Sequence, residues 1–149
     1  LRVTCTIDFD HPLLKQQRYS VSLVDGFFEK EISRARTFGF LREVDYLKRN
    51  GFAKGGSLEN AVVIDKDRIL NPEGLRYTDE FVRHKLLDCI GDFSLLGLPI
   101  LGHIVARRSG HAFHHAFVEK FFLQKDAWQT RTFDAPPTAK EVARNQLAV

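Results

Sequence analysis

Residues 81–92 carry four side chains that could do chemistry together: a histidine, a lysine and two aspartates. On a helix, at about 100° per residue, His84, Lys85, Asp88 and Asp92 fall within an arc of about 100°. His84 and Asp88 are one helical turn apart, so an imidazole nitrogen and a carboxylate oxygen can converge on one cation. That spacing is suited to zinc.

Two ligands do not make a zinc site. Catalytic zinc usually has three protein ligands and a fourth position for water, so a third ligand must come from elsewhere. The same spacing of His84 and Asp88, with Lys85 beside it, is also common on ordinary solvated helices. By spacing alone, both interpretations stay open.

The polar stripe needs a helix whose other face enters a core. The residues opposite the stripe are apolar: Val82, Leu86, Cys89, Ile90 and Phe93. The pattern predicts a helix that begins after an N-cap at Thr78 or Asp79 and runs to Leu96, with Gly97 after it.

The remaining segments alternate between strand and helix patterns. Strands are predicted over 1–9, 18–24, 60–65, 99–108 and 127–133, the first two as a hairpin. Helices are predicted over 25–35 with Asp25 as N-cap, over 40–50 with Gly51 as C-terminal cap, and over 111–123. This order predicts an α+β fold, a two-layer sandwich of a mainly antiparallel sheet against helices, with an inserted β-α-β unit at about 39–63.

Composition limits the class of protein. The 149 residues, 44% hydrophobic, suit one globular domain. The net charge of +3 is spread along the chain, which argues against a nucleic-acid partner and mildly favours an anionic small substrate. No apolar run approaches the roughly 20 residues of a membrane span. Cys5 and Cys89 form no C-x-x-C pair, which favours reduced core thiols and a cytoplasmic protein.

The chain contains no methionine and opens inside an alternating segment. A gene product begins with methionine, so we expect a piece of a longer protein. The tail at 134–149 is expected to be partly helical or mobile.

Four segments in this order carry a family resemblance: RTFGFLREVDYL, GGSLENAVV, LRYTDEFVRHKLLDCIGD and SGHAFHHAF. They resemble the UDP-3-O-acyl-N-acetylglucosamine deacetylases, zinc amidases that commit Gram-negative bacteria to lipid A synthesis. The resemblance covers about 1–133 and is most specific in the H-K-x-x-D-x-x-G-D block. It implies the second of two domains, with the first absent and the isolated fragment inactive.

The resemblance implies a role for each residue of the stripe. His84 and Asp88 would be two of three ligands to Zn²⁺, with the third, a histidine, and the general-base glutamate in the missing first domain. His111 would protonate the leaving amine, oriented by Asp92. Lys85 and Thr37 would stabilise the negative charge on the reacting acetyl group.

The resemblance also implies where the substrate UDP-3-O-acyl-N-acetylglucosamine binds. Phe38 would face the sugar, Phe9 would stack on uracil and Arg108 would approach the diphosphate. A hydrophobic passage for the 3-O-acyl chain would be lined by Leu41, Val44, Gly56, Ser57, Leu58, Ala61 and Val63. Because the same composition would serve an ordinary core equally well, that alternative stays open.

A second function is also open, a domain that binds a UDP-sugar or an acyl chain without doing chemistry. The other histidines have simpler interpretations. We expect His114 and His115 to be surface residues, His103 to lie at the edge of the core, and His11 to be a turn residue beside Pro12.

Overall fold

The computed structural model of the protein describes residues 1–23, 26–134 and 138. The N-cap predicted at Asp25 and nearly all of the predicted tail therefore lie outside the described residues. In the described ranges, no helix has the length and apolar character needed to cross a membrane.

In the described part of the chain, the main sheet has three strands in the order β2, β1, β6. They are β1 (Arg2–Ile7), β2 (Gln17–Ser22) and β6 (His103–Arg107). β1 and β2 form the predicted antiparallel hairpin, but β1 and β6 run parallel, so this sheet is mixed rather than mainly antiparallel. Because β1 and β6 run parallel, their carboxyl ends lie at the same edge of the sheet.

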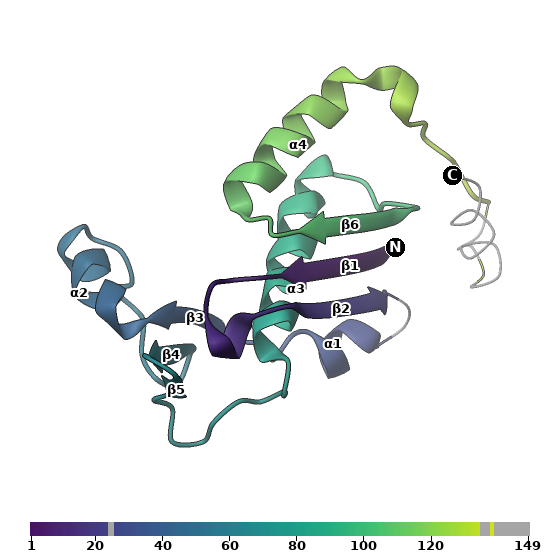
Figure 1. The fold of residues 1–149 in the computed structure, drawn as a ribbon. Coiled ribbons are helices and arrows are strands. Elements are labelled where there is room, and N and C mark those ends of the chain that lie inside the picture. Colours follow the sequence, from purple (N-terminus) through teal and green to yellow (C-terminus); the bar gives the residue numbers. More distant parts are fainter. Residues whose placement is uncertain (24–25, 135–137, 139–149) are drawn as a thin grey trace.

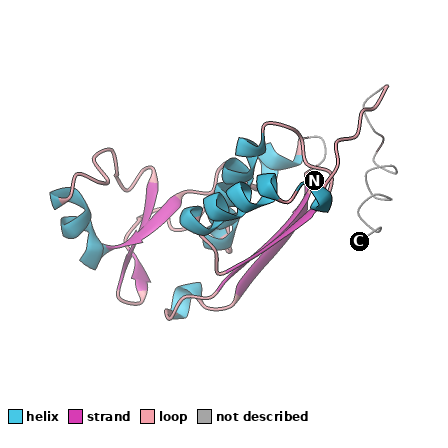
Figure 2. Ribbon diagram, turned by 90° about the horizontal axis from the view of Figure 1, so that it is seen from above, coloured by secondary structure: helices cyan, strands magenta, loops and turns pink. Residues whose placement is uncertain are grey.

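Helix α3 (Glu80–Phe93) lies against one face of this sheet, and α4 (His111–Leu123) follows β6 and contacts α3 (Figures 1 and 2). A short helix, α1 (Phe27–Glu31), lies beside β2. The α+β class is confirmed. The predicted long helix ends at Phe93, and a 3-10 turn, Ser94–Leu96, completes its length.

The core lies between β1 and α3. Every second residue of β1 is buried against the buried face of α3. The residues that meet there are Val3, Cys5, Ile7, Val82, Leu86 and Cys89. Full burial of each large aliphatic side chain stabilises the fold by about 1.5–3 kcal/mol, so this contact fixes how α3 sits on the sheet.

The inserted β-α-β unit is confirmed. It contains β3 (Thr37–Phe40), α2 (Leu41–Arg49) and β4 (Ala61–Asp65), with β3 and β4 parallel, and β5 (Arg68–Ile69) antiparallel to β4. Gly51 ends α2 at φ 80°, a conformation that glycine adopts without strain. The insert projects to one side of the main sheet (Figure 1).

The strand predicted at 127–133 is wrong. A 3-10 turn, Lys125–Ala127, follows α4, and residues 128–133 form no strand. The Trp128 ring instead stacks on Phe121, with centroids 5.4 Å apart, and its Nε1 donates to the Phe121 carbonyl. Trp128, one of the apolar residues in the predicted strand, therefore packs onto α4.

Candidate active site

Helix α3 brings the predicted metal ligands together. Nε2 of His84 lies 3.2 Å from Oδ1 of Asp88, and both side chains are largely buried, 13% and 10% exposed. The ammonium of Lys85 donates to the other oxygen of Asp88 over 2.9 Å. The stripe is therefore a connected cluster, unlike separate side chains on a solvated helix.

The His84 ring faces an oxygen atom on each side. Nδ1 lies 3.2 Å from the carbonyl oxygen of Ala35, opposite the contact of Nε2 with Asp88. Burial lowers the pKa of His84, although the charge of Asp88 opposes this, so the neutral ring is favoured. In either neutral tautomer, the nitrogen without a proton faces an oxygen that can only accept. A cation bound to Nε2 would remove this mismatch, because the proton could then stay on Nδ1.

The donor pair fits part of a zinc site. Two ligands bound at about 2.0–2.2 Å to a tetrahedral zinc are about 3.3–3.6 Å apart, close to the 3.2 Å between His84 Nε2 and Asp88 Oδ1. Among the described residues, no group of three histidine, cysteine or acidic side chains could hold a metal ion. The described residues therefore supply two ligands at most.

His111 joins this cluster from the first residue of α4. Its Nδ1 lies 2.8 Å from Oδ2 of Asp92, and its Nε2 lies 3.7 Å from Oδ2 of Asp88. The side chain is 58% exposed, whereas that of Asp92 is largely buried. A buried carboxylate thus orients an accessible imidazole whose free nitrogen faces the candidate metal ligands.

The prediction that His114 lies on the surface is wrong. The residue is only 3% exposed, its Nδ1 lies 2.7 Å from Oδ2 of Asp92, and its Nε2 lies 2.8 Å from the Ser109 hydroxyl. Its position one turn after His111 places it on the α4 face that meets α3. The i, i+3 spacing of His111 and His114 is the sequence signal that both side chains share one face of α4. It does not by itself tell a buried face from a solvated one.

The other histidines stand apart from this cluster, except one. His115 is exposed, as predicted, but its Nε2 reaches Oδ1 of Asp92 at 3.3 Å. His11 is confirmed as a turn residue, since it caps a short 3-10 turn and accepts from the Leu13 amide. His103 is exposed rather than at the core edge, and bonds to the Thr4 hydroxyl.

Three histidines contact Asp92, and two of them lower the pKa of its carboxyl. Burial raises the pKa of this carboxyl, but the hydrogen bonds and positive charges of His114 and His111 outweigh burial and lower it overall. Asp92 is thus held as a carboxylate, which accepts hydrogen bonds from Nδ1 of His111 and Nδ1 of His114.

Thr37 and Phe38 begin β3 at the side of the cluster. The Phe38 ring contacts Phe81 edge to face at 5.0 Å and lies 6.2 Å from the His84 ring. The Lys85 ammonium lies 5.6 Å from its centre. Phe38 therefore borders both the core and the cluster, whereas the preceding residue, Thr37, is exposed.

The residues predicted to line an acyl passage lie outside the core. On β4 the buried residues are Val62 and Ile64, whereas Ala61 and Val63 point the other way and are half-buried. Val44 is also half-buried, and the others are exposed: Leu41, Gly56, Ser57 and Leu58. Their burial therefore does not match the alternative of an ordinary core.

Phe9 and Arg108 lie at one edge of the main sheet. They follow the carboxyl ends of the parallel strands β1 and β6, and the Arg108 amide donates to the Thr6 carbonyl over 2.8 Å. Phe9 is partly exposed and contacts Phe38 edge to face at 5.9 Å. Topology thus brings the two residues predicted at the nucleotide end to the edge from which α4 and His111 begin.

Comparisons with known proteins identify the family of this chain. The model of the UDP-3-O-acyl N-acetylglycosamine deacetylase family (LpxC) matches residues 1–123. UDP-3-O-acyl-N-acetylglucosamine deacetylases from Myxococcus xanthus and Syntrophus aciditrophicus are 58% and 52% identical, covering 86% and 88% of this chain. The corresponding enzyme of Teredinibacter turnerae is 49% identical over 93% of the chain.

The chain spans 41%, 42% and 46% of the lengths of these three relatives. The matched residues include every member of the cluster on α3 and α4. The chain belongs to the UDP-3-O-acyl N-acetylglycosamine deacetylase family.

Proposed function

We propose that the full-length protein hydrolyses the N-acetyl group of UDP-3-O-acyl-N-acetylglucosamine, in lipid A biosynthesis, and that this chain supplies part of the active site. The observation that carries the proposal is that a pair of candidate metal ligands lies next to a histidine–aspartate pair. His84 and Asp88 converge on α3, and His111, backed by Asp92, turns its free nitrogen toward them.

The donor pair would hold zinc through Nε2 of His84 and Oδ1 of Asp88. Zinc, when bound, supplies Lewis acid chemistry, since it polarises a carbonyl and makes a water more acidic. The third protein ligand and the general base would come from a first domain outside this chain. As an isolated fragment, the chain would then be inactive.

His111 would transfer the proton that the leaving amine requires. An amide nitrogen is a poor leaving group until it is protonated, and a positioned imidazolium contributes about 10²–10⁴-fold to such a step. With Nδ1 bonded to Asp92, the transferable proton sits on Nε2, the nitrogen facing the cluster.

Lys85 and Thr37 would stabilise the negative charge that develops on the acetyl oxygen. An ammonium has three donors and Lys85 uses one on Asp88, so others are available to a substrate. Preorganised donors of this kind act most strongly where water is excluded. Phe38, whose ring lies beside the Lys85 ammonium, would help to exclude water and would face the sugar.

The rest of the substrate would extend in two directions. Phe9 and Arg108 would receive the uridine diphosphate at the sheet edge, where they follow the carboxyl ends of β1 and β6. The 3-O-acyl chain would follow the insert, over Leu41, Val44, Gly56, Ser57, Leu58, Ala61 and Val63. Their exposed or half-buried state supports this assignment.

A non-catalytic domain that binds a UDP-sugar or an acyl chain is the second candidate. It is favoured by the finding that the described residues hold no group of three metal ligands. Arg108, Phe9 and the insert would serve such a domain without any metal.

Zinc dependence separates the two candidates. The full-length protein should release acetate from the substrate, lose that activity when its metal is removed by a chelator, and regain it with one equivalent of Zn²⁺. Activity that persists in protein shown to be metal-free would overturn the zinc assignment. Substrate binding without any acetate release, in zinc-loaded protein, would favour the binding domain.

We also propose that the protein works in the cytoplasm. Its two cysteines, Cys5 and Cys89, are free and buried in the core. Free core thiols are typical of proteins kept in reducing compartments.

A further inference from the structure

A buried ion pair joins the start of α3 to the segment that enters the insert. Glu80 is the first residue of α3 and its side chain is fully buried; that of Arg36, just before β3, is 2% exposed. Oε1 of Glu80 accepts from both the backbone amide and Nε of Arg36, each over 2.9 Å. Oε2 accepts from Nη2 of Arg36 over 3.2 Å.

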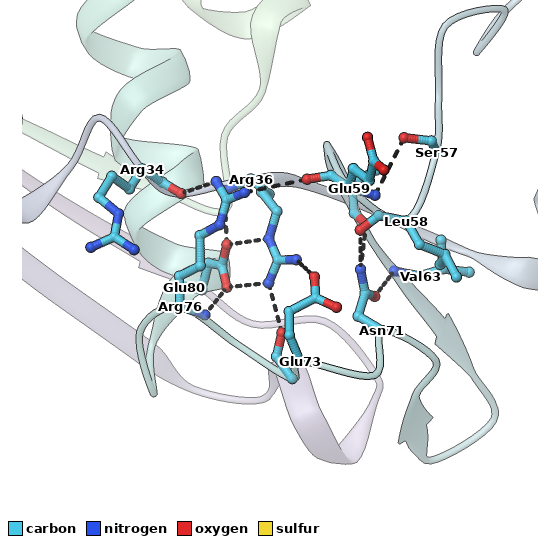
Figure 3. A network of polar contacts seen from close by, with 12 residues as sticks. Arg34, Arg36, Ser57, Leu58, Glu59, Val63, Asn71, Glu73, Arg76 and Glu80 are labelled. Carbon is cyan, nitrogen blue, oxygen red and sulfur yellow. Dashed lines mark hydrogen bonds and ion pairs between the residues drawn. The ribbon is translucent and has the colours of Figure 1, made fainter.

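The same pair also holds the segment that leaves the insert (Figure 3). Oε2 of Glu80 accepts from the Arg76 amide over 2.7 Å. Arg36 donates through Nη2 to the Gly74 carbonyl over 2.7 Å and through Nη1 to the Glu73 carboxylate. The two chain connections between the main sheet and the insert are thus tied together at one point.

Arg76 extends this connection into the insert. Its Nη1 donates to the Arg34 carbonyl over 3.0 Å, and its Nη2 donates to the Glu59 carbonyl over 3.3 Å. Figure 3 shows both bonds beside the carboxylate of Glu80. The network therefore fixes backbone on three segments that are distant in sequence.

One residue of the entering segment touches the candidate metal ligand. Ala35 precedes Arg36, is buried, and its carbonyl oxygen lies 3.2 Å from Nδ1 of His84. His84 lies one turn after Glu80 on α3. Helix α3 therefore contacts two successive residues of one segment. Glu80 binds Arg36, and His84 contacts the carbonyl of Ala35.

We propose that Glu80 and Arg36 are positioning residues for the deacetylation. They hold the Ala35 carbonyl where it accepts a hydrogen bond from Nδ1 of His84, so that an unprotonated Nε2 can bind a metal ion together with Asp88. This inference rests on the proposed function, because it assigns the pair to the orientation of a metal ligand. Outer partners of this kind fix the tautomer and ring orientation of ligating histidines.

A purely structural role is the competing explanation. A buried ion pair is often no more stabilising than apolar residues of similar volume, so burial alone does not explain it. Arg83 offers a matched control on the same helix. Its guanidinium is also largely buried, and it donates to Asp79 over 2.6 Å and to the Glu31 carboxylate over 2.7 Å.

The first test is the affinity for Zn²⁺, measured on the full-length protein by competition with a chromophoric chelator. Glu80→Gln and Arg36→Lys should each weaken the affinity by about 10- to 100-fold, at temperatures where both are folded. Arg83→Lys should leave it unchanged, even if it lowers Tm as much. Unchanged affinity in both folded variants, or an equal loss in Arg83→Lys, would overturn the proposal.

The second test needs no variant. Nitrogen-15 NMR of the zinc-loaded, full-length protein at pH 8 should show His84 bound through Nε2 and protonated on Nδ1. A ring bound through Nδ1 and protonated on Nε2 would overturn the proposal even if every variant failed to fold. A protein that binds no Zn²⁺ yet has His84 protonated on Nδ1 would refute the proposed function and leave the positioning role of the pair intact.

Discussion

His111 and Asp92, on different helices, are joined by a contact of 2.8 Å between Nδ1 and Oδ2. The other nitrogen of His111 is 3.7 Å from Asp88, whose second oxygen lies beside His84. The proposed proton donor is therefore adjacent to the proposed metal ligands but is held by a different carboxylate. Substitutions on the two sides should have different consequences.

His111→Ala, in the full-length protein, should lower kcat by about 10²–10⁴-fold while zinc stays bound. His84→Ala and Asp88→Ala should lose zinc as well as activity. The measurements are acetate release at saturating substrate and the metal content of the purified protein. Near-normal turnover by His111→Ala would show that another group supplies the proton.

The second prediction concerns His114, which holds Asp92 from the buried side. His114→Leu removes both hydrogen bonds and leaves the Ser109 hydroxyl and one lone pair of Asp92 without this partner. We expect the free energy of unfolding to fall by about 1–3 kcal/mol and kcat to fall with little change in KM. Urea unfolding and steady-state kinetics measure both effects.

Two controls separate orientation from bulk stability at this position. His114→Asn keeps a donor near the place of Nδ1, so it should recover much of the kcat lost in His114→Leu. His115→Leu removes the exposed partner of Asp92, at 3.3 Å, and should have the smaller effect. If His114→Asn were as slow as His114→Leu, the contact with Asp92 would not explain the loss.

The sequence was sufficient to predict elements with strong periodicity and the residues within one element. The α3 stripe, the opposite apolar face, and α4 over His111–Leu123 follow from local patterns. Contacts between elements were not predictable in this way. The roles of His114 and Ala35 depend on how α4 and the segment before β3 meet α3, which no single-helix pattern specifies.

Two other outcomes have the same physical cause. Glu80 has the sequence character of an ordinary acidic residue in the first turn of a helix, yet it is fully buried because Arg36 reaches it from 44 residues away. The parallel pairing of β1 with β6 was missed because hairpin patterns reveal only neighbouring strands. In both cases the structure depends on a partner that is distant in the sequence.

The third prediction concerns Arg108. Arg108→Ala should raise KM for the UDP-linked substrate more than it lowers kcat, because it removes a charge remote from the acetyl group. Alanine retains Cβ, so the strain of the positive φ of 48° is the same in both proteins. The neighbouring Arg107→Ala, an exposed position with the same change in net charge, is the control. Equal effects of the two would indicate general electrostatic attraction.

The fourth prediction is a pH dependence of stability that comes from Glu80. Burial raises its pKa, but hydrogen bonds from Arg36 and Arg76 outweigh burial and place the pKa below its ordinary value of about 4.3. Because the pKa is lower in the folded state, the stabilisation is complete above the ordinary value and is lost as pH falls through the folded value.

Glu80→Gln isolates this contribution. At pH 7 the variant should be less stable, by an amount approaching the about 3–5 kcal/mol lost when one partner of a buried ion pair is removed. The gap to the unaltered protein should narrow as pH falls below about 4. Urea unfolding of both proteins without metal, from pH 7 to 3, measures it, because bound zinc would add its own pH dependence. A constant gap would contradict the assignment.

The fifth prediction concerns the two core thiols. Burial raises the pKa of Cys5 to about 11 and that of Cys89 to about 12. Because the thiolate is the reactive form, both cysteines should resist iodoacetamide at pH 8 in the folded protein. In urea both should react fully, and no reductant should be needed because neither forms a disulfide. Mass spectrometry of the peptides containing each residue measures the labelling. Rapid labelling of either cysteine in the folded protein at pH 8 would contradict its burial in the core.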